Sequence, residues 1–167
     1  MAGSVHQFVY RQVVKGQYII EPIPDYSFCL FESIGDGLGI AGALRRRFGI
    51  IGTSKILLKL AGNRRKFYCI LFKDEIVNYG WAALSFCRHY DVREGDVVVG
   101  PVWTDPSYRS KGLAVHGMKN LINQMLSRGH SVYFVDTAES NWPMQRVIDK
   151  CGFGKPVFLY DRNGEIN

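Results

Sequence analysis

YRSKGLA, residues 108–114, decides the fold, because it has the chemistry of a tight loop that holds a diphosphate at the start of a helix. In such a loop the backbone N–H groups point into one concavity, and the first N–H groups of the helix lack partners within the helix. Gly112 permits close approach of the backbone, and Arg109 and Lys111 add positive charge. An ordinary basic loop that caps a helix has a similar composition, so the flanking segments distinguish the two interpretations.

The flanking segments favour the phosphate loop. Residues 96–104, DVVVGPVWT, are rich in β-branched and aromatic residues and predict a strand, which a turn at residues 104–106 ends. After the loop, apolar residues recur at helical spacing, and Gly129 predicts the end of that helix. Strand, loop and helix therefore follow in the order that a phosphate-binding unit requires.

A second segment repeats this arrangement of strand and helix. Residues 131–137, SVYFVDT, predict a short buried strand, and residues 141–151, NWPMQRVIDKC, predict a helix. Ser140 or Asn141 is a suitable N-terminal cap, Pro143 suits the first turn, and Gly152 follows the last turn.

Together the two segments resemble the GNAT acyltransferase superfamily. Arg109-x-x-Gly112-x-Ala114 is similar to its pyrophosphate loop, and Asn141 and the run KCGF at residues 150–153 stand where the superfamily has an Asn and a Lys-x-Gly-Phe helix end. The resemblance implies that acetyl-coenzyme A, or another acyl-coenzyme A, is the co-substrate. The residues that it implies for binding this molecule are Val102, Trp103, Thr104, Arg109, Ser110, Lys111, Gly112, Leu113, Ala114 and Asn141.

Length and composition predict one globular domain, residues 1–167. Hydrophobic residues make up 47% of the chain and charged residues 22%, which is typical of a folded protein and excludes a disordered one. No apolar run is long enough to span a membrane, and the N-terminus lacks a secretory signal, so we expect a cytoplasmic protein. The four cysteines and four histidines lack metal-ligand spacing, so no metal site is expected.

The remaining segments predict a mixed α/β fold. Strands are expected at residues 7–14, 17–23, 26–32, 67–72, 76–84 and 156–161. The first two of these are expected to form a hairpin around Lys15-Gly16, and residues 26–32 compete for a place in the sheet. Helices are expected at residues 38–48 and 54–60. This order fits a central mixed sheet flanked by helices, as in the GNAT fold, and the resemblance covers about residues 55–160 and is strongest over 96–153.

The strand before the phosphate loop contains an irregularity. Gly100 and Pro101 lie inside it, and Pro donates no hydrogen bond to a sheet ladder, so a bulge or splay is expected there. In GNAT enzymes the corresponding strand parts from its neighbour, and its exposed backbone binds the pantetheine arm. The alternative is an edge strand that tolerates the Pro.

The resemblance implies direct transfer of an acyl group to a primary amine. Many family members protonate the leaving thiolate with a Tyr where this chain has Ile148. Here either another side chain or a water, which Asn141 could hold, serves as the acid, or the thiolate leaves without a dedicated acid. The candidates for the base are Asp96 first, then Asp136 and Glu139. The alternative role of Asp96 is that of a solvated residue in the turn at residues 93–96.

Charge distribution suggests the acceptor. Residues 37–73 contain nine basic residues and no acidic one, which suggests an anionic small-molecule amine, such as a nucleotide-linked amino sugar of surface-polysaccharide pathways. A solvated helical face is the alternative explanation of this basic segment. The candidate acceptor-binding residues are Arg45, Arg46, Arg47, Tyr79 and Trp81.

Two other classes of function stay open. One is acetylation of a macromolecular amine, on a protein or an aminoacyl-tRNA, with nucleic acid the less favoured partner. The other is a non-catalytic coenzyme A-binding or membrane-peripheral module, in which residues 54–66, SKILLKLAGNRRK, lie on anionic lipid. The sequence leaves the oligomeric state open, a homodimer included.

Overall fold

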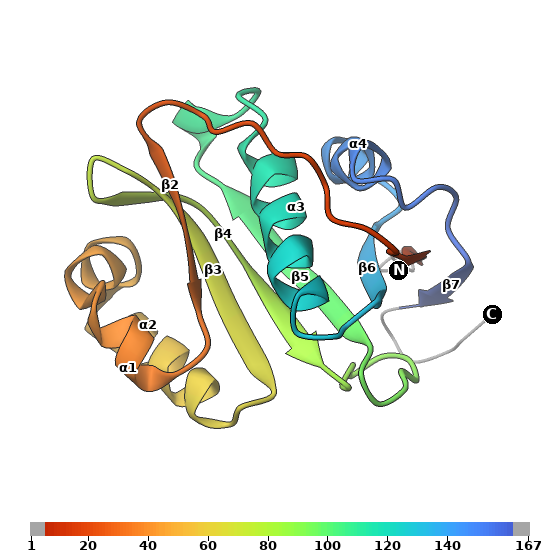
Figure 1. Cartoon of the computed structure of the whole chain (residues 1–167), viewed down its shortest axis with the longest axis horizontal. Helices are drawn as coiled ribbons and strands as arrows, with labels where there is room; N and C mark the ends of the chain where they lie inside the picture. Colours follow the sequence, from red (N-terminus) through yellow and green to blue (C-terminus); the bar gives the residue numbers. More distant parts are fainter. Residues whose placement is uncertain (1–5, 162–167) are drawn as a thin grey trace, which may run out of the picture.

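A seven-stranded mixed sheet forms the centre of the computed structural model, which describes residues 6–161 (Figure 1). The strand order is β2-β3-β4-β5-β6-β1-β7, and every neighbouring pair is antiparallel except β5 and β6. The strands are β1 His6–Val13, β2 Tyr26–Phe31, β3 Arg65–Phe72, β4 Glu75–Leu84, β5 Val97–Thr104, β6 Val132–Ala138 and β7 Phe158–Asp161. The predicted mixed α/β fold is confirmed.

Helices cover both faces of the sheet. They are α1 Ile34–Leu38, α2 Ala41–Ala61, the short 3₁₀ helix η1 Pro106–Tyr108, α3 Leu113–Leu126 and α4 Trp142–Lys150. Side chains of successive strand residues point to opposite faces, and Tyr68 of β3 packs with α3 and α4, whereas Phe67 and Cys69 pack with α2. The helices α3 and α4 therefore share one face, with α3 in front of the middle strands in Figure 1, and α1 and α2 cover the other face at its β2–β4 end.

The first strand has different partners from those predicted. Residues 17–23 form no strand, and β1 pairs instead with β6 and β7 on its two sides. Pro22 lacks a backbone N–H for a ladder, and the backbone groups of Tyr18 are satisfied by the Asn123 side chain on α3, at 2.8 and 2.9 Å. The predicted hairpin was therefore wrong, and residues 26–31 take the competing place in the sheet as β2, paired with β3.

The other predicted elements are present with small shifts. The predicted helices at 38–48 and 54–60 are two pieces of α2 that meet at Gly49, whose φ of 68° no right-handed helix contains. The β3–β4 hairpin turns at Lys73 and Asp74, both at positive φ, and Gly129 ends the α3 segment at φ 92°.

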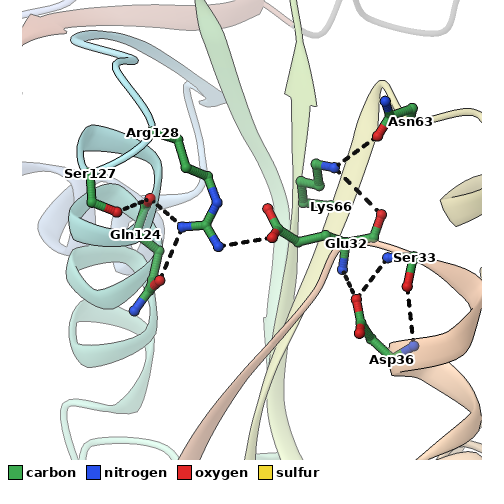
Figure 2. A network of polar contacts seen from close by, with 8 residues as sticks. All are labelled: Glu32, Ser33, Asp36, Asn63, Lys66, Gln124, Ser127 and Arg128. Atoms are coloured by element: carbon green, nitrogen blue, oxygen red, sulfur yellow. Dashed lines mark hydrogen bonds and ion pairs between the residues drawn. The ribbon is translucent and has the colours of Figure 1, made fainter.

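A polar network joins the C-terminal end of α3 to β2 and α1 (Figure 2). Arg128 forms an ion pair with Glu32 at 2.8 Å, and the buried Lys66 ammonium donates to the Glu32 carbonyl oxygen at 3.4 Å. Asp36 accepts hydrogen bonds from the N–H groups of Glu32 and Ser33, which hold the pKa of its carboxyl below its usual range. These contacts fix the α1 end of the sheet relative to α3.

Candidate active site

The strands β5 and β6 pair over three residues and then separate. Val97, Val98 and Val99 face Tyr133, Phe134 and Val135, and no further pair follows. Opposite Trp81 of β4, β5 carries one residue more than its partner, at Gly100 and Pro101, and Pro101 has no N–H with which to continue a ladder. The predicted bulge and splay are both present.

The splay exposes backbone groups of β5. Asp105 N–H donates to the Val77 carbonyl of β4 at 2.8 Å, so by the alternation of an antiparallel ladder the groups of Trp103 also face β4. Those of Val102 and Thr104 consequently face the gap, and Arg109 Nε donates to the Thr104 carbonyl from that side, at 3.3 Å. The gap is thus lined with hydrogen-bonding groups that an extended ligand can use.

Asn78 of β4 supports this edge of β5, and no sequence pattern had pointed to it. Its buried Nδ2 donates to the Trp103 carbonyl at 2.8 Å and to Thr104 Oγ1 at 2.9 Å. Asn78 therefore fixes the end of β5 through two hydrogen bonds, and we assign it a positioning role.

Two cavities meet in the gap. One, of about 620 Å³, lies against α3 and α4, and the other, of about 530 Å³, lies on the α2 face of the sheet. The residues that line both are Val102, Asn141 and Met144. Each volume is in the range of small-molecule sites, and their junction allows two ligands to meet end to end.

The cavity against α3 ends at the predicted phosphate loop. Gly112, in the left-handed conformation at φ 75°, is the N-cap of α3, and Ser110 also has positive φ, at 63°. The first intrahelical hydrogen bond is from His116 N–H to the Gly112 carbonyl, so the three N–H groups of residues 113–115 have no partner within the helix. No side chain stands within 4 Å of a Cβ built on Gly112, which leaves room for an anion.

Most of the predicted cofactor residues line this cavity. They are Val102, Trp103, Thr104, Arg109, Ser110, Gly112, Leu113, Ala114 and Asn141. Lys111 does not; its ammonium reaches toward the Tyr26 hydroxyl, at 3.4 Å. Two cations that the sequence did not reveal, Arg146 and Lys150, line it from α4. They lie four residues apart on that helix, a spacing that places them on one face.

The cavity on the α2 face is lined by cations and, among the residues that the structure describes, by one carboxylate. Lys59, Arg65 and Arg88 line it, together with Asp136 of β6. Within residues 6–161 these three cations form no ion pair, while the Tyr160 hydroxyl donates to Asp136 Oδ2 at 3.3 Å. We call this cavity the acceptor groove.

Only one of the predicted acceptor residues lines the acceptor groove, and it is Trp81. The Arg47 guanidinium lies 3.6 Å from the centre of the Trp103 ring, which in turn stacks on Tyr79. Arg46 binds the Asp74 carbonyl, and Arg45 is exposed and lines neither cavity. The basic segment does reach the groove, but through Lys59 and Arg65.

The three candidate bases have different surroundings. Asp96 is buried and accepts a hydrogen bond from Arg93 N–H at 2.9 Å, which is the geometry of a turn, and it lines neither cavity. Glu139 also lines neither cavity. Asp136 alone faces the acceptor groove.

Asn141 stands at the junction of the two cavities. Its Oδ1 accepts from Met144 N–H at 3.3 Å and caps α4, and its Nδ2 donates to no residue among 6–161. Ile148, at the position of the family's Tyr, is fully buried in the core. Among the described residues, no group of three or more His, Cys, Asp or Glu is arranged to hold a metal ion.

The profile of the acetyltransferase (GNAT) family matches residues 39–153, most of the chain. The chain belongs to the GNAT family. As a GNAT acetyltransferase it is an enzyme that uses acetyl-coenzyme A, and the loop at Gly112, with its unpaired N–H groups, fits the diphosphate of this co-substrate. The family match begins at residue 39, earlier than the resemblance in sequence indicated.

Solved structures agree with this fold at low sequence identity. Ribosomal-protein-S5-alanine acetyltransferase from Vibrio fischeri matches with a TM-score of 0.60 and 16% identity, over 81% of this chain and 82% of that one. A protein from Clostridium acetobutylicum described as a predicted acetyltransferase, with acetyl-CoA, matches with a TM-score of 0.55 and 18% identity, over 85% of this chain and 96% of that one. Aminoglycoside N-acetyltransferase AAC(6′)-Iy, with a bisubstrate analogue, matches at 0.58 and 15%, over 78% and 92%. No curated protein sequence matches the chain.

Proposed function

We propose that this GNAT enzyme acetylates the primary amine of a small anionic molecule bound in the acceptor groove, such as a nucleotide-linked amino sugar. The observation that carries the proposal is the acceptor groove itself, which meets the co-substrate cavity at Asn141. Three cations that have no ion-pair partner among residues 6–161 line it together with Asp136. Cations that are left unpaired in a concave site favour a ligand that brings negative charge.

The acetyl thioester supplies an activated acyl group when acetyl-coenzyme A is bound. The N–H groups of Val102 and Thr104 face the gap and stabilise negative charge that develops beside β5. Asp136 accepts the proton of the acceptor ammonium, since it is the one candidate carboxylate that lines the groove.

Asn141 completes the site where the family's Tyr is missing. Because its Oδ1 is held by the α4 cap, its Nδ2 keeps a defined direction and donates a hydrogen bond to the departing sulfur or to a water beside it. The thiolate is thereby stabilised without a dedicated side-chain acid, which is consistent with the burial of Ile148.

The experiment is a thiol-release assay with acetyl-coenzyme A and matched pairs of amines that differ in a phosphate or nucleoside-diphosphate group. We expect the anionic member of a pair to have the higher kcat/KM, and R65A and R88A to raise its KM without changing that of the neutral member. R45A is the matched control, because Arg45 is exposed outside both cavities. Equal turnover of both members would refute the anionic acceptor, and a steep loss of activity with salt would indicate a macromolecular polyanion instead.

The role of Asp136 has its own test. D136N should lower kcat/KM at neutral pH by a factor of about 100 or more, the usual contribution of a general base, while coenzyme A binding stays unchanged. D96N should lower the stability of the turn at Arg93 without a specific loss of kcat. The opposite pattern would transfer the base role to Asp96.

A further inference from the structure

The outward side of α2 carries large apolar side chains that the fold leaves uncovered. Ile50, Ile51 and Leu58 are 74%, 72% and 72% exposed. With Ser54 and Lys55 they recur at spacings of three and four residues, so they share one stripe on the surface of the helix. We call these five residues the α2 outer face. The inward side of the same helix is also apolar, with Ile56 and Leu60 in the core, so burial against the sheet does not account for the outer face.

The neighbouring helix α1 extends this surface. Ile34 and Leu38, one helical turn apart, are 40% and 58% exposed. Gly37 packs α1 against α2, because a Cβ built there would lie 2.7 Å from a Leu57 methyl carbon and 3.4 Å from one of Leu60. Figure 1 shows both helices together at the β2–β3 end of the sheet, away from α4. Exposed apolar residues that are grouped in this way indicate a surface for interaction.

The positive charge of residues 37–73 indicates which kind of partner this surface binds. Residues 37–73 include nine Lys and Arg and no Asp or Glu, and within residues 6–161 only Arg47 of these nine forms an ion pair, with Asp105 at 3.8 Å. A second copy of the same face would bring like charges together, which opposes self-association through it. A partner with an anionic surface therefore matches the charge of the α2 outer face and the basic residues around it.

We propose that the α2 outer face docks the enzyme on an anionic phospholipid surface. The Ile and Leu side chains enter the headgroup region, and Lys55 and the other exposed Lys and Arg residues of 37–73, which exclude Arg65 and the buried Lys66, contact lipid phosphates. Helices that lie in the membrane interface present exposed apolar side chains beside Lys and Arg in this way. Among residues 6–161 no helix is long and apolar enough to cross a membrane, so the contact is peripheral. The predicted lipid-binding segment was residues 54–66, but Ile56 and Leu60 of that segment face the core. The apolar residues offered to lipid are therefore Ile50, Ile51 and Leu58.

The docking surface adjoins the acceptor groove. Lys59 follows Leu58 on α2 and lines the groove, where its ammonium lies 5.3 Å from the centre of the Trp81 ring. Docking through the α2 outer face therefore places the part of the acceptor groove that Lys59 lines close to the lipid surface. The docking proposal itself does not rest on the identity of the acceptor.

Vesicle flotation of the full chain tests the proposal. We expect the protein to float with vesicles of phosphatidylcholine that contain about one third phosphatidylglycerol, and not with phosphatidylcholine alone. K55Q should weaken partition of the protein to the anionic vesicles about fivefold, and a rise in salt should weaken partition of the wild type by a similar factor. I51S and L58S should each weaken partition about tenfold. Since these side chains are largely exposed, thermal unfolding and coenzyme A binding should stay as in the wild type.

The matched control is I19S. Ile19 is 97% exposed, but it follows Tyr18, which is bound to α3 on the opposite face of the sheet, so its loss should leave partition unchanged. No flotation with the anionic vesicles, or equal partition of wild type, I51S and L58S, would overturn the proposal. Binding to polyglutamate without binding to vesicles would also overturn it, in favour of an acidic protein partner.

Discussion

Gly117 on α3 offers a sharp test of how the co-substrate site is supported. The helix lies directly on the sheet there, and a Cβ built on Gly117 would lie 2.7 Å from Tyr68 Cε2 and 2.8 Å from Asn78 Oδ1. Neither neighbour can retreat, because Tyr68 is fully buried and stacks on Phe28, and Asn78 is held by its two hydrogen bonds to β5. The absence of a side chain at Gly117 thus sets the height of α3 above the sheet.

The expected effect of G117A is a net loss of stability. In a helix with free space, replacing Gly by Ala stabilises by about 1 kcal/mol. The overpacking here costs about 2–3 kcal/mol, the upper part of the usual range, because neither neighbour can move. The net loss should therefore be about 1–2 kcal/mol. For a chain of 167 residues this lowers Tm by about 3–6 °C. Because α3 begins at the phosphate loop, the displaced helix should also raise the Kd for coenzyme A.

Thermal unfolding with and without coenzyme A measures both effects, and G42A is the matched control. Gly42 lies in α2, where a Cβ would meet only the flexible end of Arg46, at 3.6 Å, so G42A should stabilise by about 0.5 kcal/mol. In a Y68L background the cost of G117A should shrink, because the ring that it strikes is gone. If G117A and G42A change Tm in the same direction, the reasoning about close approach is refuted.

Three further predictions concern side chains in the site and the frame. N141D should keep the α4 cap and the wild-type Tm while lowering kcat, because it keeps the capping oxygen and loses the Nδ2 donor. N141A should lower kcat and also reduce the free energy of unfolding by about 1 kcal/mol, because it removes the cap. Equal activity of N141D and the wild type would exclude Asn141 from catalysis. Cys29 lies opposite Cys69 in the β2–β3 ladder, and its hydrogen bond with Cys69 lowers its pKa to about 7, so alkylation of Cys29 should rise with pH through about 7 as thiolate forms. The same hydrogen bond, and then burial, raise the pKa of the Cys69 thiol, which should therefore stay unmodified. Mass spectrometry after iodoacetamide treatment checks this, and equal labelling of both would contradict it. E32A and R128A should each reduce the free energy of unfolding by less than about 1 kcal/mol, since the Glu32–Arg128 ion pair is partly exposed. Their coupling energy in a double-mutant cycle should fall as salt is added. A larger coupling energy that does not depend on salt would refute the description of this pair as a weak surface ion pair.

The local features of the site were predictable because a few neighbouring residues determine each of them. Gly112 permits the left-handed turn that opens α3, Asn141 caps α4 with its own side chain, and Pro101 interrupts the β5 ladder, whatever the rest of the chain does. The order of strand, loop and helix around Gly112 was likewise correct.

The partners of the strands and the walls of the acceptor groove were decided only by tertiary structure. Residues 17–23 have a strand-like pattern, but β1 finds its neighbour more than a hundred residues away, with Gln7 opposite Ala138. Lys59 and Arg88 enter the acceptor groove from α2 and from the loop after β4, and nothing in their spacing relates them to Asp136. Sequence by itself determined where the phosphate loop and the splay occur, because backbone conformation is a local property. Tertiary structure determined which charges face each other across the splay, because contact between distant segments depends on how the whole sheet is assembled.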